Sequence, residues 1–389
     1  MSQLTECSVL TAADIPAVKE LWSICFNDTP KFVDWYFREY YRVEDALGIK
    51  KNEQLLAAAQ VVPYELEIRN KRMMAGYVVG VMTAPEGRHS GYAKSLLAAG
   101  LAKMREEKTA LSILMPFEGQ FYYRYGWSFC YFQQWYQIES QDLACLAAEY
   151  GEVQKIEPQV YLPVLHNIYH TMMATRYHGY AYRKTKDWEN LLADYALEGA
   201  QWFILKEQDN YEGYLLCLEQ GNRLVVQEVA YVNRKAYQGL LWYLQQQEKA
   251  LEIHTGPNDE LAYALAKTKE GILQYPFLMA RIVDVEQCLQ SIAYPVDYSG
   301  CVFTVKDEFA AWNNRTYHFA VQEGRALITP SVEEAQLTID IHGLTMLVMG
   351  ARTAKQLAYE GHLENASEEI LTAWTALWPL QDNYINAYY

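Results

Sequence analysis

The spacing of hydrophobic residues predicts an α/β unit in the first part of the chain. Apolar positions at helical spacing predict a helix that begins near residue 15. Two long strand-like runs follow, at residues 55–68 and 73–83, with a polar turn between them. An amphipathic helix is predicted at residues 91–106, and a short apolar run at 110–115 returns as a strand. The order strand, helix, strand is that of an α/β unit.

The middle of the chain repeats this order with one change. The pattern predicts two helices, at 160–176 and 237–250, and three strands between them, at 202–205, 214–218 and 224–232. The join before the second helix reads Asn233-Arg234-Lys235-Ala236-Tyr237-Gln238 and contains no glycine. Its backbone therefore cannot approach a phosphate as closely as a glycine-containing join. We interpret this part as a degenerate copy of the first.

The last part of the chain has a third pattern, in which short strands joined by Gly and Asn turns precede several helices. The predicted strands lie at 301–305, 316–321 and 326–329, and the predicted helices at 344–350, 353–360 and 368–377. This order is typical of a small α+β module. We expect three domains, at residues 1–150, 151–285 and 286–389, which agrees with the length of 389 residues.

The charge of the chain narrows the classes of partner. Its 33 Lys and Arg and 48 Asp and Glu give a formal charge of −15, which argues against nucleic acid and against an anionic membrane surface. The same charge suits a cationic partner. No stretch approaches the ~18–20 apolar residues of a membrane-spanning helix, and the first residues lack the pattern of a signal peptide. The seven cysteines are scattered without CxxC spacing, so we expect a soluble cytoplasmic protein with no metal site.

The sharpest chemical signal lies between the second strand-like run and the helix after it. The segment reads Val81-Met82-Thr83-Ala84-Pro85-Glu86-Gly87-Arg88-His89-Ser90-Gly91-Tyr92-Ala93, so that Arg-x-x-Gly-x-Ala opens the helix. The unpaired N–H groups and positive dipole end of a helix N-terminus suit a pyrophosphate. Gly91 and Ala93 let the backbone come close, and Arg88 supplies a cation. The alternative is an ordinary strand–turn–helix junction.

This segment resembles the acetyl-CoA motif of the GNAT N-acetyltransferase superfamily, (Q/R)xxGx(G/A). A second segment, Glu118-Gly119-Gln120-Phe121-Tyr122-Tyr123-Arg124-Tyr125-Gly126-Trp127, is similar to the EGxIYGRFGY segment of the enhanced-intracellular-survival (Eis) family. That family joins a catalytic GNAT domain, a degenerate GNAT-like domain and a sterol-carrier-like α+β domain. The resemblance implies these tandem GNAT-like domains and the C-terminal sterol-carrier-like domain over essentially the whole chain.

The resemblance also implies roles for individual residues. Acetyl-CoA would be the co-substrate, and the strand before the loop would pair with its pantetheine arm. The implied cofactor contacts are Val81, Met82, Thr83, Arg88, His89, Gly91, Tyr92 and Ala93. Tyr122 falls on the family's general acid, which protonates the departing CoA thiolate. The family's general base is the C-terminal α-carboxylate, which here would be that of Tyr389.

These two roles are chemically sensible. A phenol with a pKa of about 10 stays protonated at neutral pH and can reprotonate a thiolate. A carboxylate with a pKa of about 3.5 is a weak base, so we expect a water relay or a carboxylate with a raised pKa. Two positions depart from the family pattern. Tyr123 stands where the family has Gly, so a second phenol lies beside the candidate acid, and Arg88-His89 replaces an Arg-Arg pair.

The acceptor side has a weaker signal. Phe26-Asn27-Asp28 resembles a Phe-x-Asp element that lines the family's amine pocket, and Trp35 is a candidate aromatic wall. Asp28 could hold a cationic amine by a charge-assisted hydrogen bond. Alternatively, Asp28 caps a helix that begins near Pro30.

The sequence favours an acetyl-CoA-dependent N-acetyltransferase acting on a small cationic amine such as an aminoglycoside, a polyamine or a lysine side chain. Transfer would be direct, in a ternary complex. One alternative is a non-catalytic CoA- or lipid-binding protein with a vestigial motif, and another is a protein N-acyltransferase that uses a longer acyl group. The family resemblance also implies a homo-oligomer, a hexamer.

Overall fold

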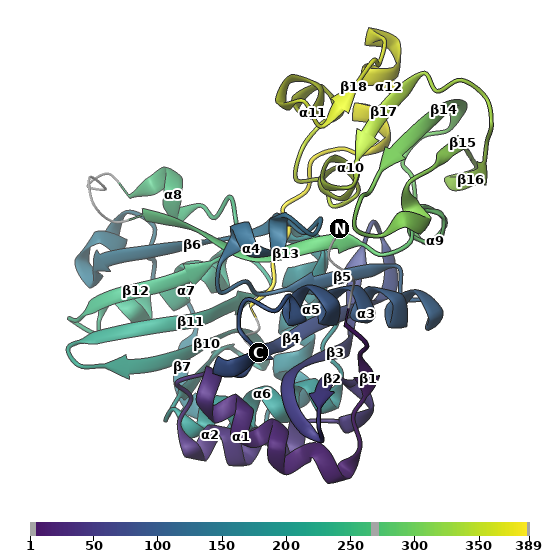
Figure 1. The fold of residues 1–389 in the computed structure, drawn as a ribbon. Helices are drawn as coiled ribbons and strands as arrows, with labels where there is room; N and C mark the ends of the chain where they lie inside the picture. Colours follow the sequence, from purple (N-terminus) through teal and green to yellow (C-terminus); the bar gives the residue numbers. More distant parts are fainter. Residues whose placement is uncertain (1–4, 266–271, 387–389) are drawn as a thin grey trace. The chain divides into compact units, whose positions relative to one another are not determined.

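The computed structural model describes residues 5–265 and 272–386, and their contacts divide them into two compact units (Figure 1). The first unit contains the described residues up to Cys130 together with Leu278–Gln381. The second unit contains the described residues of Tyr131–Phe277 and the tail that begins at Asp382. The chain therefore returns to its central part after it has completed the C-terminal module.

The first unit contains a sheet with the strand order β1-β2-β3-β4-β5-β13. Neighbouring strands are antiparallel except β4 and β5, which are parallel and connected by helix α3. The elements are β1 (Ser8–Val9), η1 (Ala12–Asp14), α1 (Ile15–Cys25), α2 (Pro30–Trp35), η2 (Tyr36–Tyr40), η3 (Val43–Asp45), β2 (Ala46–Lys51), β3 (Gln54–Ile68), β4 (Lys71–Thr83), η4 (Pro85–Gly87), α3 (Tyr92–Glu106), β5 (Leu111–Leu114) and α4 (Gly119–Tyr123). Strands β6 (Ser128–Glu139) and β13 (Ile272–Ile282) carry the chain into and out of the second unit.

Helix α3, which connects β4 and β5, packs on this sheet through a hydrophobic face. Leu96, Leu97, Leu101 and Met104 fall on one face of α3 and are buried, as the helical spacing predicts. They belong to one hydrophobic cluster with Val61 of β3 and other side chains of the sheet. This packing fixes the direction of α3 and therefore the place where its N-terminus lies.

The C-terminal module of the first unit has its own sheet, with the order β16-β15-β14-β17-β18. Its elements are α9 (Val285–Ser291), β14 (Tyr298–Lys306), η6 (Ala311–Asn313), β15 (Thr316–Gln322), β16 (Arg325–Pro330), β17 (Leu337–Asp340), α10 (Ile341–Val348), α11 (Ala354–Glu360), β18 (Leu363–Glu364) and α12 (Glu368–Leu377). Aromatic rings fill its core, where Trp374 contacts Phe303 and Trp378 stacks on Phe319. The predicted α+β module is confirmed.

Two buried arginines join this module to the N-terminal sheet. Arg69, at the turn between β3 and β4, donates to the carbonyl oxygens of Leu347 at 3.1 Å and Val348 at 3.0 Å. Arg281 on β13 donates to both carboxylate oxygens of Asp307, at 2.9 and 2.7 Å. These partners offset the cost of burying two cations.

The second unit repeats the plan of the first. Its strand order is β6-β12-β11-β10-β9-β7, and helix α7 connects the parallel pair β11 and β12. The elements are η5 (Ser140–Cys145), β7 (Glu152–Ile156), α5 (Leu162–Arg176), β8 (Tyr180–Ala181), α6 (Thr185–Leu197), β9 (Gln201–Glu207), β10 (Asn210–Gln220), β11 (Arg223–Tyr231), α7 (Arg234–Gln245), β12 (Ala250–Thr255) and α8 (Leu261–Ala264). The predicted repeat of the first domain's order is confirmed.

The predicted bounds of one helix are wrong. The helix expected at residues 237–250 begins at Arg234 and ends at Gln245. Glu248 has a φ of 51°, which a right-handed helix cannot contain, and Ala250 already begins strand β12. Strands β6, β12 and β13 and helix α6 were not predicted.

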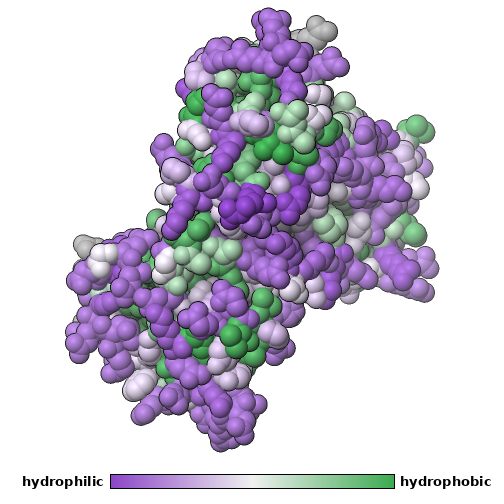
Figure 2. All heavy atoms as spheres, turned by 90° about the horizontal axis from the view of Figure 1, so that it is seen from below, coloured by the Kyte–Doolittle hydropathy of each residue, from purple (hydrophilic) through white to green (hydrophobic). Residues whose placement is uncertain are grey.

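The face drawn in Figure 2 is mostly hydrophilic, with hydrophobic residues in smaller groups among the hydrophilic ones. Among the described helices, none is long and apolar enough to cross a membrane.

Candidate active site

The carboxyl-terminal part of β4 has an edge that β5 does not cover. β4 pairs with β3 as far as Thr83, whereas its described pairing with β5 ends at Val78. The Ala84 N–H donates to the Leu56 carbonyl oxygen on β3 at 2.8 Å. Successive residues of a strand direct their backbone groups to opposite sides, so Val81 and Thr83 direct theirs away from β3. This edge can therefore pair with an extended ligand.

The loop after β4 exposes the N-terminus of α3. His89 and Gly91 have left-handed φ values of 63° and 80°. A Cβ at Gly91 would meet no atom within 4 Å, so the backbone conformation, and not crowding inside the protein, favours glycine here. The Ser95 N–H donates to the Gly91 carbonyl at 3.1 Å, which leaves the N–H groups of the preceding turn without partners inside the helix. They form the positive end of a helix of 15 residues.

A cavity of about 770 Å³ lies at this loop, inside the first unit. Its walls come from the end of α1, the end of β4, the loop with the first turn of α3, and the segment around α4. The described residues that line it are Cys25, Phe26, Val81, Thr83, Gly87, Arg88, His89, Gly91, Tyr92, Ala93, Lys94, Phe117, Phe121, Arg124 and Tyr125. The cavity thus brings together all the predicted cofactor residues except Met82, whose side chain is buried at 2% exposure.

The cavity is electropositive although the chain as a whole is acidic. Arg88, Lys94 and Arg124 line it, and none of the described lining residues is acidic. The Arg124 guanidinium lies over the Phe121 ring, 5.7 Å from its centre, which holds its stem along the wall. Three cations beside a helix N-terminus make a site suited to a pyrophosphate. The sequence analysis did not identify Lys94 and Arg124 as cofactor contacts, because only their positive charge points to that role.

Three neighbouring tyrosines occupy three different environments. Tyr122 is buried at 4% exposure, and its ring packs edge-on against Phe117 and Phe121 of the cavity wall, with centroids 5.7 and 5.0 Å away. Burial raises the pKa of the Tyr122 phenol. Tyr125 lines the cavity.

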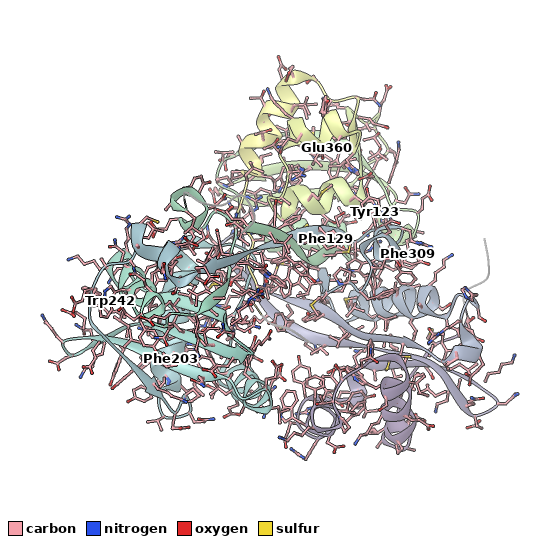
Figure 3. The ribbon with its side chains drawn as sticks, turned by 90° about the vertical axis from the view of Figure 1, so that its left-hand side faces the viewer. Tyr123, Phe129, Phe203, Trp242, Phe309 and Glu360 are labelled. Carbon is pink, nitrogen blue, oxygen red and sulfur yellow. The ribbon has the colours of Figure 1, made fainter. Side chains whose placement is uncertain are left out.

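Tyr123 faces the C-terminal module of the same unit, where its ring stacks on His342 at 4.0 Å. Figure 3 shows it beside Phe129 and Phe309, below the yellow-green module. Its ring is therefore engaged by a partner outside the cavity wall. Tyr122 does not line the cavity itself, but it packs against two phenylalanines that do. Of Tyr122 and Tyr123, it is therefore the better candidate for the general acid.

The three predicted acceptor residues lie in different places. Phe26 lines the cavity, and its ring contacts Trp22 with centroids 4.9 Å apart. Asp28 accepts a hydrogen bond from the Trp22 indole at 2.8 Å. The cap of α2 is Thr29, which accepts from the Phe32 N–H, so the alternative role of Asp28 as that cap is wrong. Trp35 is buried and is not among the residues that line the cavity. The remaining candidate, Tyr389, lies outside the described residues.

At the corresponding join in the second unit, a side chain of the protein caps the N-terminus of α7. Asn233 accepts a hydrogen bond from the Ala236 N–H at 2.9 Å and so caps α7. Arg234 pairs with Glu260 at 3.3 Å. The glycine-free join therefore satisfies part of the helix N-terminus within the protein, which agrees with its interpretation as a degenerate copy.

Comparison with known families divides the chain in the same order. Residues 6–130 match a GNAT acetyltransferase domain, residues 179–282 match another GNAT acetyltransferase domain, and residues 285–386 match a sterol carrier protein domain. No curated protein matches the chain in sequence.

Solved structures with the same fold cover the whole chain. A GCN5-related N-acetyltransferase from Anabaena variabilis is 19% identical with a TM-score of 0.88, over 99% of this chain and 100% of that one. A conserved protein of unknown function from Enterococcus faecalis is 19% identical with a TM-score of 0.88, over 99% of each chain. Eis1 from Mycobacterium abscessus is 17% identical with a TM-score of 0.82, over 99% of this chain and 100% of that one. The chain thus consists of two GNAT acetyltransferase domains followed by a sterol carrier protein domain, which confirms the predicted fold.

Proposed function

We propose that the first GNAT domain transfers the acetyl group of acetyl-CoA to a small cationic amine. The observation that carries this proposal is the electropositive cavity at the N-terminus of α3, where Arg88, Lys94 and Arg124 surround the loop with left-handed Gly91. A CoA pyrophosphate would accept hydrogen bonds from the unpaired N–H groups of α3 and from these cations. The pantetheine arm would pair with the uncovered edge of β4 at Val81 and Thr83.

The chemistry requires one new bond, one broken bond and two proton movements. The amine nitrogen attacks the thioester carbonyl carbon, and the carbon–sulfur bond breaks. Backbone N–H groups near Val81 would polarise the carbonyl oxygen. Tyr122 would donate its proton to the departing sulfur, and the carboxylate of Tyr389 would receive the proton that the amine nitrogen loses.

The burial of Tyr122 has two consequences for its role as the acid. Burial raises the pKa of the phenol, which keeps the phenol protonated across the neutral range but also makes it a weaker proton donor to the thiolate. The chain's overall negative charge supports a cationic acceptor, because it raises the local concentration of polyamines and related cations. For the acceptor site, we propose that Phe26 forms part of the wall and that Asp28 and Trp35 lie behind the residues that line the cavity.

Calorimetry with acetyl-CoA and a thiol-release assay together test the proposal. We expect binding in the micromolar range and thiol release that depends on an added amine from a panel of aminoglycosides, polyamines and peptides. Binding without release for every amine and for longer acyl-CoA donors would favour a non-catalytic CoA-binding protein. The absence of binding would overturn the proposal.

A further inference from the structure

The first unit contains a buried arginine whose hydrogen bonds are incomplete. Arg281 on β13 is fully buried, and its Nη2 donates to both carboxylate oxygens of Asp307, at 2.9 and 2.7 Å. In the part of the chain that the structure describes, its Nε and Nη1 have no hydrogen-bond partner. A buried donor without a partner costs free energy, and well-packed hydrophobic residues often replace a buried ion pair without loss of stability. The presence of Arg281 therefore needs an explanation other than stability.

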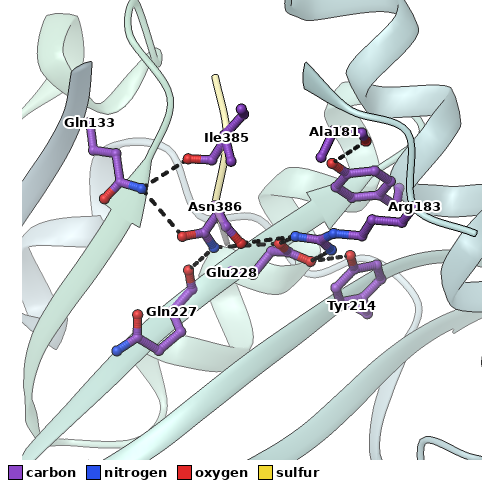
Figure 4. Close-up of polar contacts among 9 residues, drawn as sticks. Gln133, Ala181, Arg183, Tyr214, Gln227, Glu228, Ile385 and Asn386 are labelled. Atoms are coloured by element: carbon purple, nitrogen blue, oxygen red, sulfur yellow. Dashed lines mark hydrogen bonds and ion pairs between the residues drawn. The ribbon is translucent and has the colours of Figure 1, made fainter. Parts of the chain in front are cut away.

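The buried arginine of the second unit is bound differently (Figure 4). Arg183 donates through Nη1 and Nη2 to the two carboxylate oxygens of Glu228, at 2.8 and 2.6 Å, and the Tyr214 hydroxyl donates to the same carboxylate. Both terminal nitrogens of Arg183 thus face its carboxylate, as in an ordinary bidentate pair. Arg281 uses only one terminal nitrogen for Asp307, and the other lies against a different part of the first unit.

That part is the turn that follows α4. A Cβ at Gly126 would lie 1.4 Å from Arg281 Nη1, so the guanidinium occupies the space beside the Gly126 backbone that any other residue would need. The guanidinium also lies 5.4 Å from the centre of the Trp127 ring. The Trp127 indole donates to Ser112 Oγ on β5 at 3.3 Å. Arg281 and β5 therefore hold the end of this turn.

Backbone hydrogen bonds connect the end of the turn to the candidate acid. The Tyr125 N–H donates to the Tyr122 carbonyl, and the Gly126 N–H donates to the Tyr123 carbonyl, both at 2.9 Å. Residues 122–127 are thus closed into one turn, which we call the acid turn. A displacement of Gly126 or Trp127 would pass through these bonds to the backbone that carries the Tyr122 ring.

The sterol carrier module contacts the acid turn at two points. The Asp307 carboxylate also accepts hydrogen bonds from the Phe309 N–H at 3.2 Å and the Ala310 N–H at 3.0 Å, so its direction is fixed by the module. The carboxylate in turn aims the Arg281 guanidinium. The Phe309 ring packs against Tyr125 with centroids 4.8 Å apart. We call Arg281, Asp307 and Phe309 the brace.

We infer that Arg281 is a positioning residue for Tyr122, and that the sterol carrier module braces the acid turn through Asp307 and Phe309. The inference rests on the proposed role of Tyr122 as the general acid. A hydrophobic side chain could fill the same volume, but Asp307 could not aim it at Gly126, whereas a planar guanidinium has a fixed orientation. Acyl transfer depends steeply on such placement, since errors of about 1 Å can cost about a hundredfold in rate.

The test uses the full-length protein with two brace variants and one matched control. Arg281→Lys keeps a positive charge opposite Asp307 but loses the planar fork beside the acid turn. Phe309→Leu removes the ring on Tyr125 without unpairing a buried charge. Arg69→Lys is the control, because Arg69 is also buried and also joins the module to the N-terminal sheet, through carbonyl oxygens at the C-terminal end of α10. If Arg281→Lys fails to fold, Phe309→Leu still tests the brace.

The first measurement does not require activity. Hydrogen exchange followed by mass spectrometry reports how often the amides of Tyr125 and Gly126 in the acid turn open. We expect these amides to exchange about tenfold faster in the brace variants than in the natural chain, and within about twofold of the natural rate in Arg69→Lys. Equal exchange in the brace variants and the control would overturn the brace.

The second measurement separates positioning of the acid from a general structural role. We expect Arg281→Lys to lower kcat at saturating acetyl-CoA by about tenfold in the natural chain. In a Tyr122→Phe background the same change should lower kcat by less than about twofold, because the group that Arg281 positions is already absent. A tenfold loss in both backgrounds, or no loss in the natural chain, would refute the positioning role.

The two measurements also distinguish a failure of this inference from a failure of the proposed function. If the natural chain transfers no acetyl group to any amine, the proposed function fails and Tyr122 has no acid role for Arg281 to support. Hydrogen exchange in the acid turn still decides in that case whether the sterol carrier module braces it.

Discussion

The tyrosines at 122, 123 and 125 show how environment separates residues of one type. Tyr122 is enclosed by the phenylalanines of the cavity wall, so burial raises its pKa. Tyr123 is stacked on His342, and Tyr125 packs against Phe309 with centroids 4.8 Å apart. A general acid needs a proton at working pH and a place near the leaving group. Tyr122 meets the first condition and adjoins the cavity.

We predict that Tyr122→Phe lowers kcat by about a hundredfold or more and leaves the Kd for acetyl-CoA within about twofold. The ring keeps its contacts with Phe117 and Phe121, so only the transferable proton is lost. Steady-state kinetics with a thiol readout and calorimetry measure the two quantities. Tyr123→Phe is the matched control, and if it loses kcat in place of Tyr122→Phe, the acid is misassigned.

Gly91 and Gly126 both have a positive φ, but we predict that alanine at the two positions lowers the unfolding free energy by different amounts. Gly91→Ala meets no atom within 4 Å, so it is expected to lose only the backbone preference, about 1–2 kcal/mol of unfolding free energy. Gly126→Ala has a φ of 95° and would place its Cβ 1.4 Å from Arg281 Nη1, which adds the cost of overpacking and gives a loss of about 3 kcal/mol. Denaturant unfolding measures both. Equal losses of unfolding free energy in the two variants would contradict the close contact between a Cβ at position 126 and Arg281.

At the scale of elements, the anion site is assembled from three segments. Arg88 comes from the loop, Lys94 from α3 and Arg124 from the residue after α4. We predict that Arg124→Gln weakens acetyl-CoA binding about tenfold and lowers its dependence on salt, because one charge-assisted contact is lost. Arg72→Gln is the control, since Arg72 lies near the opposite end of β4. The same loss in both variants would contradict a local contact.

The sequence predicts the crossover β4–α3–β5 because period-two and helical spacing are both strong there. It does not predict β6, whose buried residues include Gln133 together with Cys130 and Tyr131, so no clean alternation marks the strand. The cofactor loop is predictable because its residues are contiguous. Arg124 is not, because only the fold brings it to the loop. The Arg183–Glu228 pair joins residues 45 positions apart, and nothing local in the sequence signals such a pair.

At the scale of the whole first unit, the sterol carrier module supports the tyrosine segment. His342 of α10 accepts or donates a hydrogen bond with Ser128 at 2.8 Å and stacks on Tyr123. Arg281 on β13 reaches Asp307 in the module and lies 5.4 Å from the Trp127 ring. The segment that carries Tyr122 is therefore held between the N-terminal sheet and the module. A change that weakens the packing of the module should therefore also weaken the packing of this segment.

Protonation of His342 in acid is such a change. Burial, and to a lesser extent the nearby Arg281 and His362, lower the pKa of His342 to about 4, although Asp340 and Asp307 favour its charged form. An unfolded histidine has a pKa of about 6.5. Between these values the unfolded chain binds a proton that the folded chain does not, so stability falls as the pH falls from about 6.5 towards 4 and is fully present above that window.

We predict that acidification from pH 7 to pH 5 lowers the unfolding free energy of the first unit by about 2 kcal/mol through this histidine. Urea unfolding at the two pH values, in the natural chain and in His342→Gln, measures the contribution as a difference of differences, which removes the titration of other groups. His342→Gln keeps a side chain that can bond to Ser128 but cannot be protonated, so its stability should change less with acid. His318→Gln is the control, because His318 is exposed on β15. If His342→Gln and the natural chain lose the same stability on acidification, His342 is not the group that links the stability of the module to pH.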